Sequence, residues 1–367
     1  VNLPQVKRPR GRPPKHAALP KPQPGPVTLP TMCYSTAFEA KLPVPEPAKK
    51  SRQALKRGGL LSAEDFPWNN LKPEDSIALA VSNPPAGLNT RGFTARPFTK
   101  WVGGKYKLVT RLLEFVPADF EKYFEPFVGG GSMYYALSPR AKCSYISDLN
   151  SELMNTYVQL MVNLEEVKKR LRTYVYDKDF YLQVRQRDRD PAFYESDPVE
   201  RAVRLLYLLR VGYNGLYRVN SKNHFNVPFG RYTNPEICRD EVLNAASAHL
   251  NHYPTKVFVG QYYALLPFMD EKSFVYFDPP YMPVSETAFF TDYQVEGFSY
   301  QDQVTLAQFC RELDRRKIRF MLSNSCCDEV RRLYQGFNIH VLDNVMRGIN
   351  STVSLRSGHK ELVITNY

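Results

Sequence analysis

Short apolar runs that end at an acidic residue are the clearest structural pattern along this chain. Residues 142–147 form one such run and Asp148 follows it, while residues 273–277 form another and Asp278 follows that one. Apolar runs of this length, flanked by helical stretches, predict buried strands of an α/β fold. Each acidic residue would then lie where a strand ends.

The segments around these runs have apolar residues at the spacing of a helix. Residues 200–211 place Ala, Val and Leu at intervals of three and four, which predicts a helix. A basic helix end over residues 311–317 leads into strand-like residues 319–322. The alternation of helices and strands indicates an α/β fold, and no internal repeat is visible.

The composition fits a folded protein with a basic tail. The chain has 367 residues, 43% of them hydrophobic, and a net charge of +12. Residues 1–60 contain twelve basic and two acidic residues and twelve of the 29 prolines, so nearly all of the positive excess lies there. We expect this tail to be disordered, because it cannot bury enough apolar surface to offset its chain entropy. Residues 61–92 are interpreted as a connector.

Within the tail, the run Arg10-Gly11-Arg12-Pro13 resembles an AT-hook. In such a motif the glycine lets the backbone lie in a narrow A·T minor groove, and the arginines reach along it. Arg10 and Arg12 are therefore candidate DNA contacts. A basic linker or a localisation signal is the alternative interpretation.

Other classes of protein are disfavoured. The six cysteines include no Cys-x-x-Cys pair, so they indicate neither a zinc site nor a disulfide framework, and no metal cofactor is expected. No apolar run approaches the roughly 18 to 20 residues of a membrane span, and no secretory signal is evident. We expect reduced thiols, a cytoplasmic location and no membrane partner.

A glycine-rich turn is the first candidate binding site. Apolar residues lead into Gly129-Gly130-Gly131, and a helix-like segment follows. Asp148 comes about 20 residues later, the distance at which a carboxylate takes ribose hydroxyls in a nucleotide-binding αβ unit. Neither a dinucleotide motif nor a phosphate loop is present, which disfavours both NAD-type cofactors and ATP hydrolysis. Upstream, Trp101 stands beside two glycines and Lys105, where an indole could cap a cationic or aromatic ligand.

The second candidate site is Asp278-Pro279-Pro280-Tyr281, directly after the apolar run 273–277. The prolines stiffen the loop and leave the Pro279 carbonyl available to accept a hydrogen bond. Asp278 supplies a carboxylate and Tyr281 an aromatic face. By itself the tetrapeptide could be no more than a rigid turn.

Taken in order, these segments resemble the N6-adenine DNA methyltransferases of the Dam type, over roughly residues 96–367. The similarity is most specific over residues 210–220 and 225–232, which look like the hairpin with which that family reads GATC. The resemblance implies a doubly wound, Rossmann-like methyltransferase sheet with an inserted, mainly helical target-recognition domain that carries a β-hairpin. Residues 93–150 and 253–367 would form the catalytic domain, and residues 151–252 the recognition domain.

The resemblance also implies a methyl donor, S-adenosylmethionine, and a partner, double-stranded DNA. The residues implied to bind the donor are Trp101, Lys105, Glu125, Phe127, Gly129, Gly131, Asp148, Gln261, Tyr262 and Asp278. In the hairpin, Tyr213 and Asn214 correspond to residues that fill the space left by the extruded base. The implied base-reading positions are Leu216, Arg218, Pro228 and Arg231.

The residues suggest how methyl transfer would proceed. The target adenine must leave the duplex, because its N6 atom is otherwise stacked and inaccessible. The Asp278 carboxylate and the Pro279 carbonyl would accept the two N6 hydrogens while Tyr281 stacks on the ring. Arg218 and Arg231 could pair with guanine. Five further arginines could hold phosphates, although for most of them a helical face paired with Asp188, Asp190 and Glu200 is the simpler interpretation; they are Arg185, Arg187, Arg189, Arg201 and Arg204. Arg347, Arg356 and Lys360, near the end of the chain, could also contact DNA.

The same residues are also compatible with other functions. The chain could methylate adenine in another target, or N4 of cytosine, since both activities use similar tetrapeptides. It could also be an architectural DNA-binding protein that keeps an inactive methyltransferase domain.

Overall fold

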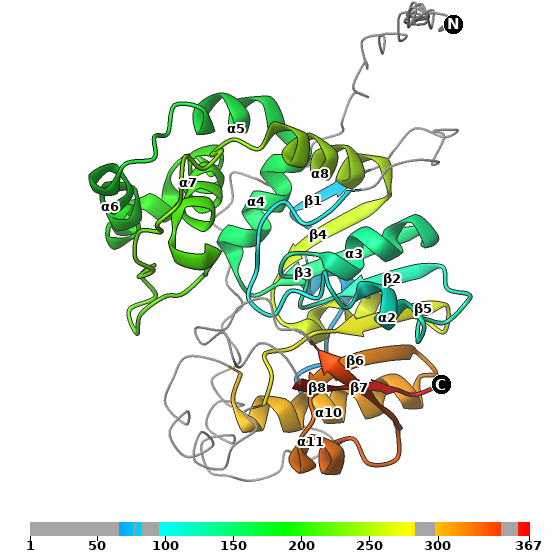
Figure 1. Cartoon of the computed structure of the whole chain (residues 1–367). Coiled ribbons are helices and arrows are strands. Elements are labelled where there is room, and N and C mark those ends of the chain that lie inside the picture. Colours follow the sequence, from blue (N-terminus) through cyan, green and yellow to red (C-terminus); the bar gives the residue numbers. More distant parts are fainter. Residues whose placement is uncertain (1–65, 77, 83–94, 283–297, 346–358) are drawn as a thin grey trace, which may run out of the picture. The chain divides into compact units, whose positions relative to one another are not determined.

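Eight strands form one mixed sheet in the computed structural model, which describes residues 66–76, 78–82, 95–282, 298–345 and 359–367. Across the sheet the order is β1-β4-β3-β2-β5-β6-β8-β7 (Figure 1). The strand bounds are β1 Ala80–Ser82, β2 Lys122–Glu125, β3 Cys143–Asp148, β4 Thr255–Val259, β5 Ser273–Phe277, β6 Arg319–Ser325, β7 Asn338–Val345 and β8 His359–Thr365.

The middle of the sheet is parallel. Strands β4, β3, β2, β5 and β6 pair in parallel, whereas β1, β8 and β7 join antiparallel at the two sides. Every residue of β5 is buried, as expected for a parallel strand covered on both faces. The expected α/β class is confirmed. The predicted bounds of β5 agree with the structure, and β3 extends one residue further to include Asp148.

Helices cover the sheet and form a block between β3 and β4 (Figure 1). The helix bounds are α2 Val109–Leu113, α3 Ser132–Leu137, α4 Ser151–Val162, α5 Leu164–Leu171, α6 Lys178–Gln186, α7 Pro198–Val211, α8 Asp240–His252, α10 Tyr300–Arg315 and α11 Asp328–Leu333. Within the block, α7 packs against α4, α5 and α6, and α4 also contacts β3 and β4.

Helix α7 shows why the sequence is helical here. The Asp197 side chain accepts a hydrogen bond from the Val199 amide, and Pro198 occupies the first turn, where no amide hydrogen is needed. Its apolar residues are buried against the neighbouring helices, which agrees with the helix predicted over residues 200–211. The helix ends at Val211, and the candidate recognition segment begins immediately after it.

The predicted hairpin is present as an irregular antiparallel pair. Isolated bridges join Gly212 to Phe229 and Val219 to Phe225, and the Tyr213 amide donates to the Pro228 carbonyl at 2.9 Å. No regular strand forms over these described residues. Pro228 lacks an amide hydrogen and Asn214 has a φ of 56°, and both features interrupt regular strand pairing.

The connector contributes to the fold. Trp68 is buried and packs edge-on against Phe309 of α10, with ring centroids 5.1 Å apart. Strand β1 pairs with β4, and the Ser82 hydroxyl donates to the Tyr253 carbonyl at 3.0 Å. The connector therefore supplies an edge strand to the sheet through β1 and a buried aromatic ring to the core through Trp68.

Several predicted features lie outside the described residues. They are the tail over residues 1–60 with Arg10 and Arg12, residues 61–65 and 83–92 of the connector, Arg347 and Arg356.

Candidate active site

The order of the strands reverses between β2 and β5, which makes the carboxyl ends of these two strands the topological switch point of the sheet. Strand β2 continues through β3 to β4 on one side, while β5 continues to β6 on the other. Open α/β sheets bind ligands at such a switch point. Glu125 is the last residue of β2, and Asp278 is the first residue after β5. The topology therefore brings the two sequence motifs to one place.

The glycine turn after β2 is shaped by close contacts. Gly129 has a φ of +47°, and a Cβ added there would lie 2.6 Å from Trp101 Cδ1. Gly131 has a φ of +74° and caps α3, and an added Cβ would lie 2.6 Å from the Tyr157 hydroxyl. Trp101 and Tyr157 leave no room for a side chain at these positions, and both positive φ values are ones that glycine adopts readily. Trp101 also stacks on Tyr217, with centroids 5.2 Å apart.

Asp148 links the turn to the end of β3. Its carboxylate accepts hydrogen bonds from the Gly129 amide at 3.2 Å and the Asn150 amide at 2.9 Å. Desolvation by the surrounding protein raises the pKa of Asp148, although these backbone hydrogen bonds oppose the rise. Two hydroxyl donors from a ligand would satisfy the remaining acceptor capacity of this carboxylate.

An apolar wall adjoins the turn. Phe127 stacks on Tyr262, with centroids 5.6 Å apart, and Tyr262 belongs to the 3-10 helix η8 (Tyr262–Phe268). Gln261 precedes this helix and is partly exposed. Glu125 is buried and accepts a hydrogen bond from the Tyr123 hydroxyl at 2.7 Å. Burial raises the pKa of Glu125 well above its ordinary value.

Asp278 lies in a buried cluster of charges. Lys105 Nζ is 2.6 Å from Asp278 Oδ1 and 3.9 Å from Glu361 Oε1. The Tyr281 hydroxyl donates to Glu361, and Lys105 Nζ lies 4.6 Å from the centre of the Tyr281 ring. Burial raises the pKa of Asp278 to about 6, although Lys105 lowers it. Sequence reasoning missed Glu361, because this residue lies on the last strand, far along the chain from the tetrapeptide.

Side chains from β6 and α10 fix the tetrapeptide loop from behind. Gln303 Nε2 donates to the Pro280 carbonyl at 2.8 Å, and Asn324 Oδ1 accepts from the Met282 amide at 3.2 Å. The Ser325 hydroxyl donates to the Met282 carbonyl at 2.6 Å. No motif marks these polar residues in the sequence, and only the sheet topology brings them to the loop.

The recognition segment forms a second concave site. A hollow of about 380 Å³ is lined by Tyr213, Asn214, Pro228, Phe229, Arg231 and Tyr232. Four of these six were predicted to contact DNA. Leu216 is half-buried and lies outside this hollow, as does the exposed Arg218, whose Nε donates to Asn226 Oδ1 at 2.6 Å. Arg231 is exposed and makes no ion pair with another described residue.

The five arginines between Arg185 and Arg204 make contacts within the protein. Arg201 pairs with Glu152 and Arg204 with Asp188, and both arginines are buried. Arg187 pairs with Glu200 and Arg189 with Asp188, while Arg185 donates to the Val227 carbonyl at 3.0 Å. The interpretation of these residues as phosphate contacts is therefore not favoured. Asp190 caps a 3-10 turn, and Lys360 pairs with Asp343 at 3.3 Å.

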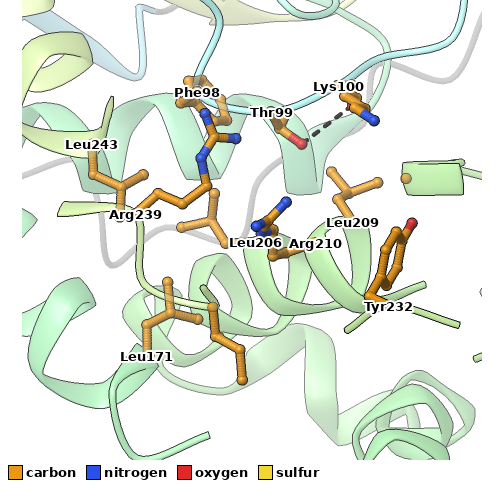
Figure 2. Close-up of a pocket in the computed structure, with 12 residues that line it drawn as sticks. Phe98, Thr99, Lys100, Leu171, Leu206, Leu209, Arg210, Tyr232, Arg239 and Leu243 are labelled. Carbon is orange, nitrogen blue, oxygen red and sulfur yellow. Dashed lines mark hydrogen bonds between the residues drawn. The ribbon is translucent and has the colours of Figure 1, made fainter. Parts of the chain in front are cut away.

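A small basic pocket lies beside the recognition segment (Figure 2). Its volume is about 50 Å³, and Lys100, Arg210 and Arg239 contribute cationic groups to its lining. None of the three forms an ion pair with a carboxylate within the described ranges. Burial, together with the neighbouring Arg210 and Arg96, lowers the pKa of Arg239. The pocket therefore favours an anion.

Fold and site together define an α/β protein in which the glycine turn after β2 and the tetrapeptide after β5 meet at the switch point of the sheet. The chain belongs to the D12 class of N6 adenine-specific DNA methyltransferases, whose family profile matches residues 101–347. It is thus an adenine-N6 DNA methyltransferase, and DNA is its substrate. This family implies the use of S-adenosylmethionine. The description of this family names N6 of adenine, and not N4 of cytosine, as the methylated position.

Named relatives cover most of the chain. A type II methyltransferase, M1.LlaDCHI of Lactococcus lactis subsp. cremoris, is 43% identical over 282 residues, covering 76% of this chain and 98% of the relative. M.MjaIII of Methanocaldococcus jannaschii is 38% identical, covering 74% and 99%. The DNA adenine methylase of Escherichia coli K12 is 35% identical, covering 73% and 94%.

Metal ligands and membrane spans are both lacking among the described residues. These residues contain no group of three or more His, Cys, Asp or Glu side chains arranged to hold a metal ion. None of the helices described is both long enough and apolar enough to span a bilayer.

Proposed function

We propose that this enzyme methylates N6 of adenine within GATC in double-stranded DNA. The observation that carries the proposal is the pairing of two sites on one chain. Asp278 lies at the switch point of the sheet, and the recognition segment offers a hollow lined by Tyr213, Asn214 and Arg231. Another adenine-containing target is the alternative, and it would require different base contacts from the same hollow.

The residues around the glycine turn fit S-adenosylmethionine as the donor. The turn admits no side chain at Gly129 or Gly131, so a ligand can lie against its backbone. Glu125 and Asp148 are carboxylates whose pKa values are raised by desolvation, so cationic or hydroxyl partners would stabilise their ionised forms. We expect them to bind the donor's methionine end and ribose, and Tyr262 and Gln261 to lie near its adenine. Trp101 would close over the turn.

Asp278 and Pro279 would orient the attacking nitrogen. N6 is a weak nucleophile because its lone pair is conjugated with the ring. Two acceptors, the Asp278 carboxylate and the Pro279 carbonyl, would bind its two hydrogens and favour a tetrahedral nitrogen. Within the described ranges no donor bonds to the Pro279 carbonyl, whereas the Pro280 carbonyl is taken by Gln303. Positioning and electrostatics of this kind account for most of the expected acceleration.

The bound donor supplies a methyl group on a sulfonium, and its carbon–sulfur bond breaks as the carbon–N6 bond forms. The N6 proton can leave after the methyl group arrives, so Asp278 need not act as a base. Tyr281 would stack on the target ring. Since Lys105 lies over the Tyr281 ring at 4.6 Å, the base would occupy the opposite face.

Recognition would require the adenine to leave the duplex, at a cost of a few kcal/mol. Tyr213 is exposed beside Asn214, and the two could fill the gap left in the stack. Arg218 and Arg231 are exposed and could each pair with guanine O6 and N7. Leu216 and Pro228 would add apolar contacts. The basic pocket of Lys100, Arg210 and Arg239 suits a backbone phosphate.

Asp278→Ala tests the proposed chemistry. We expect methyl transfer to GATC duplexes to fall by at least about 100-fold, because a preorganised acceptor is lost. Asp343→Ala, on the exposed side of β7, is the matched control and should keep wild-type activity. Thermal unfolding would check that both variants fold.

Sequencing of the methylated bases would identify the target. Full activity of Asp278→Ala would contradict the mechanism. Methylated adenine outside GATC in DNA treated with the wild-type enzyme would contradict the assigned target and leave the mechanism in place.

A further inference from the structure

Glu361 reaches the active site because of the direction of its strand. Strand β8 runs antiparallel to β6, and Ser325 at the end of β6 pairs with Glu361 near the start of β8. The first residues of β8 therefore lie at the edge where β5 delivers Asp278. Glu361 is only 2% exposed, and a buried carboxylate is costly unless it is paired.

The contacts of Glu361 connect it to both functional groups of the tetrapeptide. It accepts a hydrogen bond from the Tyr281 hydroxyl. Its Oε1 is 3.9 Å from Lys105 Nζ, which in turn is 2.6 Å from Asp278 Oδ1. The two carboxylates thus share one ammonium group.

We propose that Glu361 is a positioning residue for methyl transfer, which fixes the Tyr281 ring and sets the charge balance around Asp278. The inference rests on the proposed roles of Asp278 and Tyr281. Glu361 touches neither substrate in this account. It acts through the Tyr281 hydroxyl, which fixes the plane of the ring, and through its negative charge, which lies on the far side of Lys105 Nζ at 3.9 Å and disfavours ionisation of Asp278.

Several groups face Asp278 and determine when it is ionised. Lys105 comes from the segment before α2 and favours the carboxylate, as does the Tyr281 hydroxyl. Glu361 from β8 opposes ionisation, and Glu125 of β2 and Tyr276 of β5 interact with the same charge. Removing the negative charge of Glu361 should make Asp278 easier to ionise.

The size of this effect follows from the distances. The two carboxylates are at most about 6.5 Å apart through Lys105 Nζ. At the effective dielectric constant of about 20 suited to proteins, charges at this separation shift a titration by about two pH units. Glu361→Gln should therefore move the acid limb of kcat/KM to lower pH by about that amount. A purely structural role would lower the rate without moving the limb.

The experiment compares Glu361→Gln, Glu361→Asp, Tyr281→Phe and the double variant Glu361→Gln/Tyr281→Phe. Methyl transfer from S-adenosylmethionine to a GATC duplex is measured from about pH 4 to about pH 9, because the acid limb of Glu361→Gln is expected well below that of the wild type. We expect kcat of Glu361→Gln to fall about 10- to 100-fold with little change in the KM for DNA, since a misplaced group costs rate rather than binding. Glu361→Asp should recover part of the loss. Glu329→Gln, the same change on the exposed part of α11, is the control.

The outcomes separate this inference from the proposed function. If the double variant loses less than the product of the two single losses, Glu361 acts through Tyr281 as proposed. Independent losses together with an unmoved acid limb would overturn the inference. In that case the proposed chemistry would remain supported, provided that the wild-type enzyme methylates adenine and the Asp278→Ala variant does not. If Asp278→Ala remains active, the proposed chemistry itself fails.

Discussion

Lys105→Gln offers the most direct test of the buried charge cluster. Lys105 is 5% exposed, its Nζ donates to Asp278 Oδ2 at 2.8 Å and to the Gly103 carbonyl at 2.7 Å, and it forms an ion pair with Asp278 Oδ1 at 2.6 Å. Glutamine is shorter and neutral, so it removes the cation while leaving a polar side chain. Asp278 would then ionise beside Glu361 with no ammonium group between them.

The pKa of Asp278 sets the expected size of the effect. Burial raises this pKa from 3.8 to about 6 even with Lys105 in contact. Removing one partner of a buried ion pair costs about 3 to 5 kcal/mol, and 1.36 kcal/mol corresponds to one pKa unit. The lower part of this range predicts a pKa of about 8 to 9 in the variant. At pH 7.5 only about 3 to 25% of Asp278 would be ionised, against nearly all of it in the wild type.

The pH dependence of kcat/KM distinguishes this effect from a general loss of structure. The carboxylate is the active form, so activity rises with pH through its pKa, near 6 in the wild type. In Lys105→Gln the rise should occur near pH 8 to 9, and activity should partly recover there. Lys107→Gln, an exposed lysine in the same segment, is the matched control. If kcat/KM of Lys105→Gln were reduced equally at every pH, with its acid limb unmoved, the assigned role of Lys105 in ionising Asp278 would be wrong.

Two further predictions concern DNA. Arg231→Ala should reduce discrimination at one guanine by about 1 to 3 kcal/mol, measured as the ratio of kcat/KM for GATC and for singly altered sites; an unchanged ratio would contradict its assigned role. Removing residues 1–60, with their twelve basic residues, should weaken DNA binding and reduce the salt slope by about 0.9 for each phosphate that the tail neutralises, while target preference is retained. A truncated enzyme with the full salt slope would show that the tail's charge is not used on DNA.

Helices and strands could be predicted from the sequence where the local hydrophobic pattern matches the burial of the element in the fold. Strand β5 reads as an uninterrupted apolar run because it is covered on both faces, so its bounds were predictable. The recognition hairpin was expected from family resemblance, but its bridges are irregular, since Pro228 and the left-handed Asn214 interrupt the ladder. Glu361 could not be predicted. Its place depends on the antiparallel insertion of β8, which no local pattern encodes.

Burial also separated arginines that the sequence could not distinguish. Arg204 and Arg231 have the same chemistry, yet Arg204 is 4% exposed and paired with Asp188, whereas Arg231 is exposed on the recognition hollow. Sequence position alone could not decide between a structural ion pair and a base contact. The packing of α7 into the helical block buries Arg204, and a buried guanidinium is stable only when a carboxylate pairs with it. Burial therefore assigns Arg204 to a structural ion pair.

The arrangement of charge explains how one enzyme can serve two oppositely charged substrates. Glu125, Asp148, Asp278 and Glu361 gather at the carboxyl edge of the sheet, where the proposed donor carries a positive sulfonium. During transfer that positive charge moves from sulfur toward N6, and the proposed position of Asp278 is at the receiving nitrogen, so its interaction strengthens as the reaction proceeds. Lys105 is the cation that pairs with Asp278 at this edge, while Arg218 and Arg231 are exposed on the recognition segment, and twelve further basic residues belong to the tail by sequence. This separation of charge would let the enzyme bind the proposed cationic donor and a polyanionic duplex at the same time.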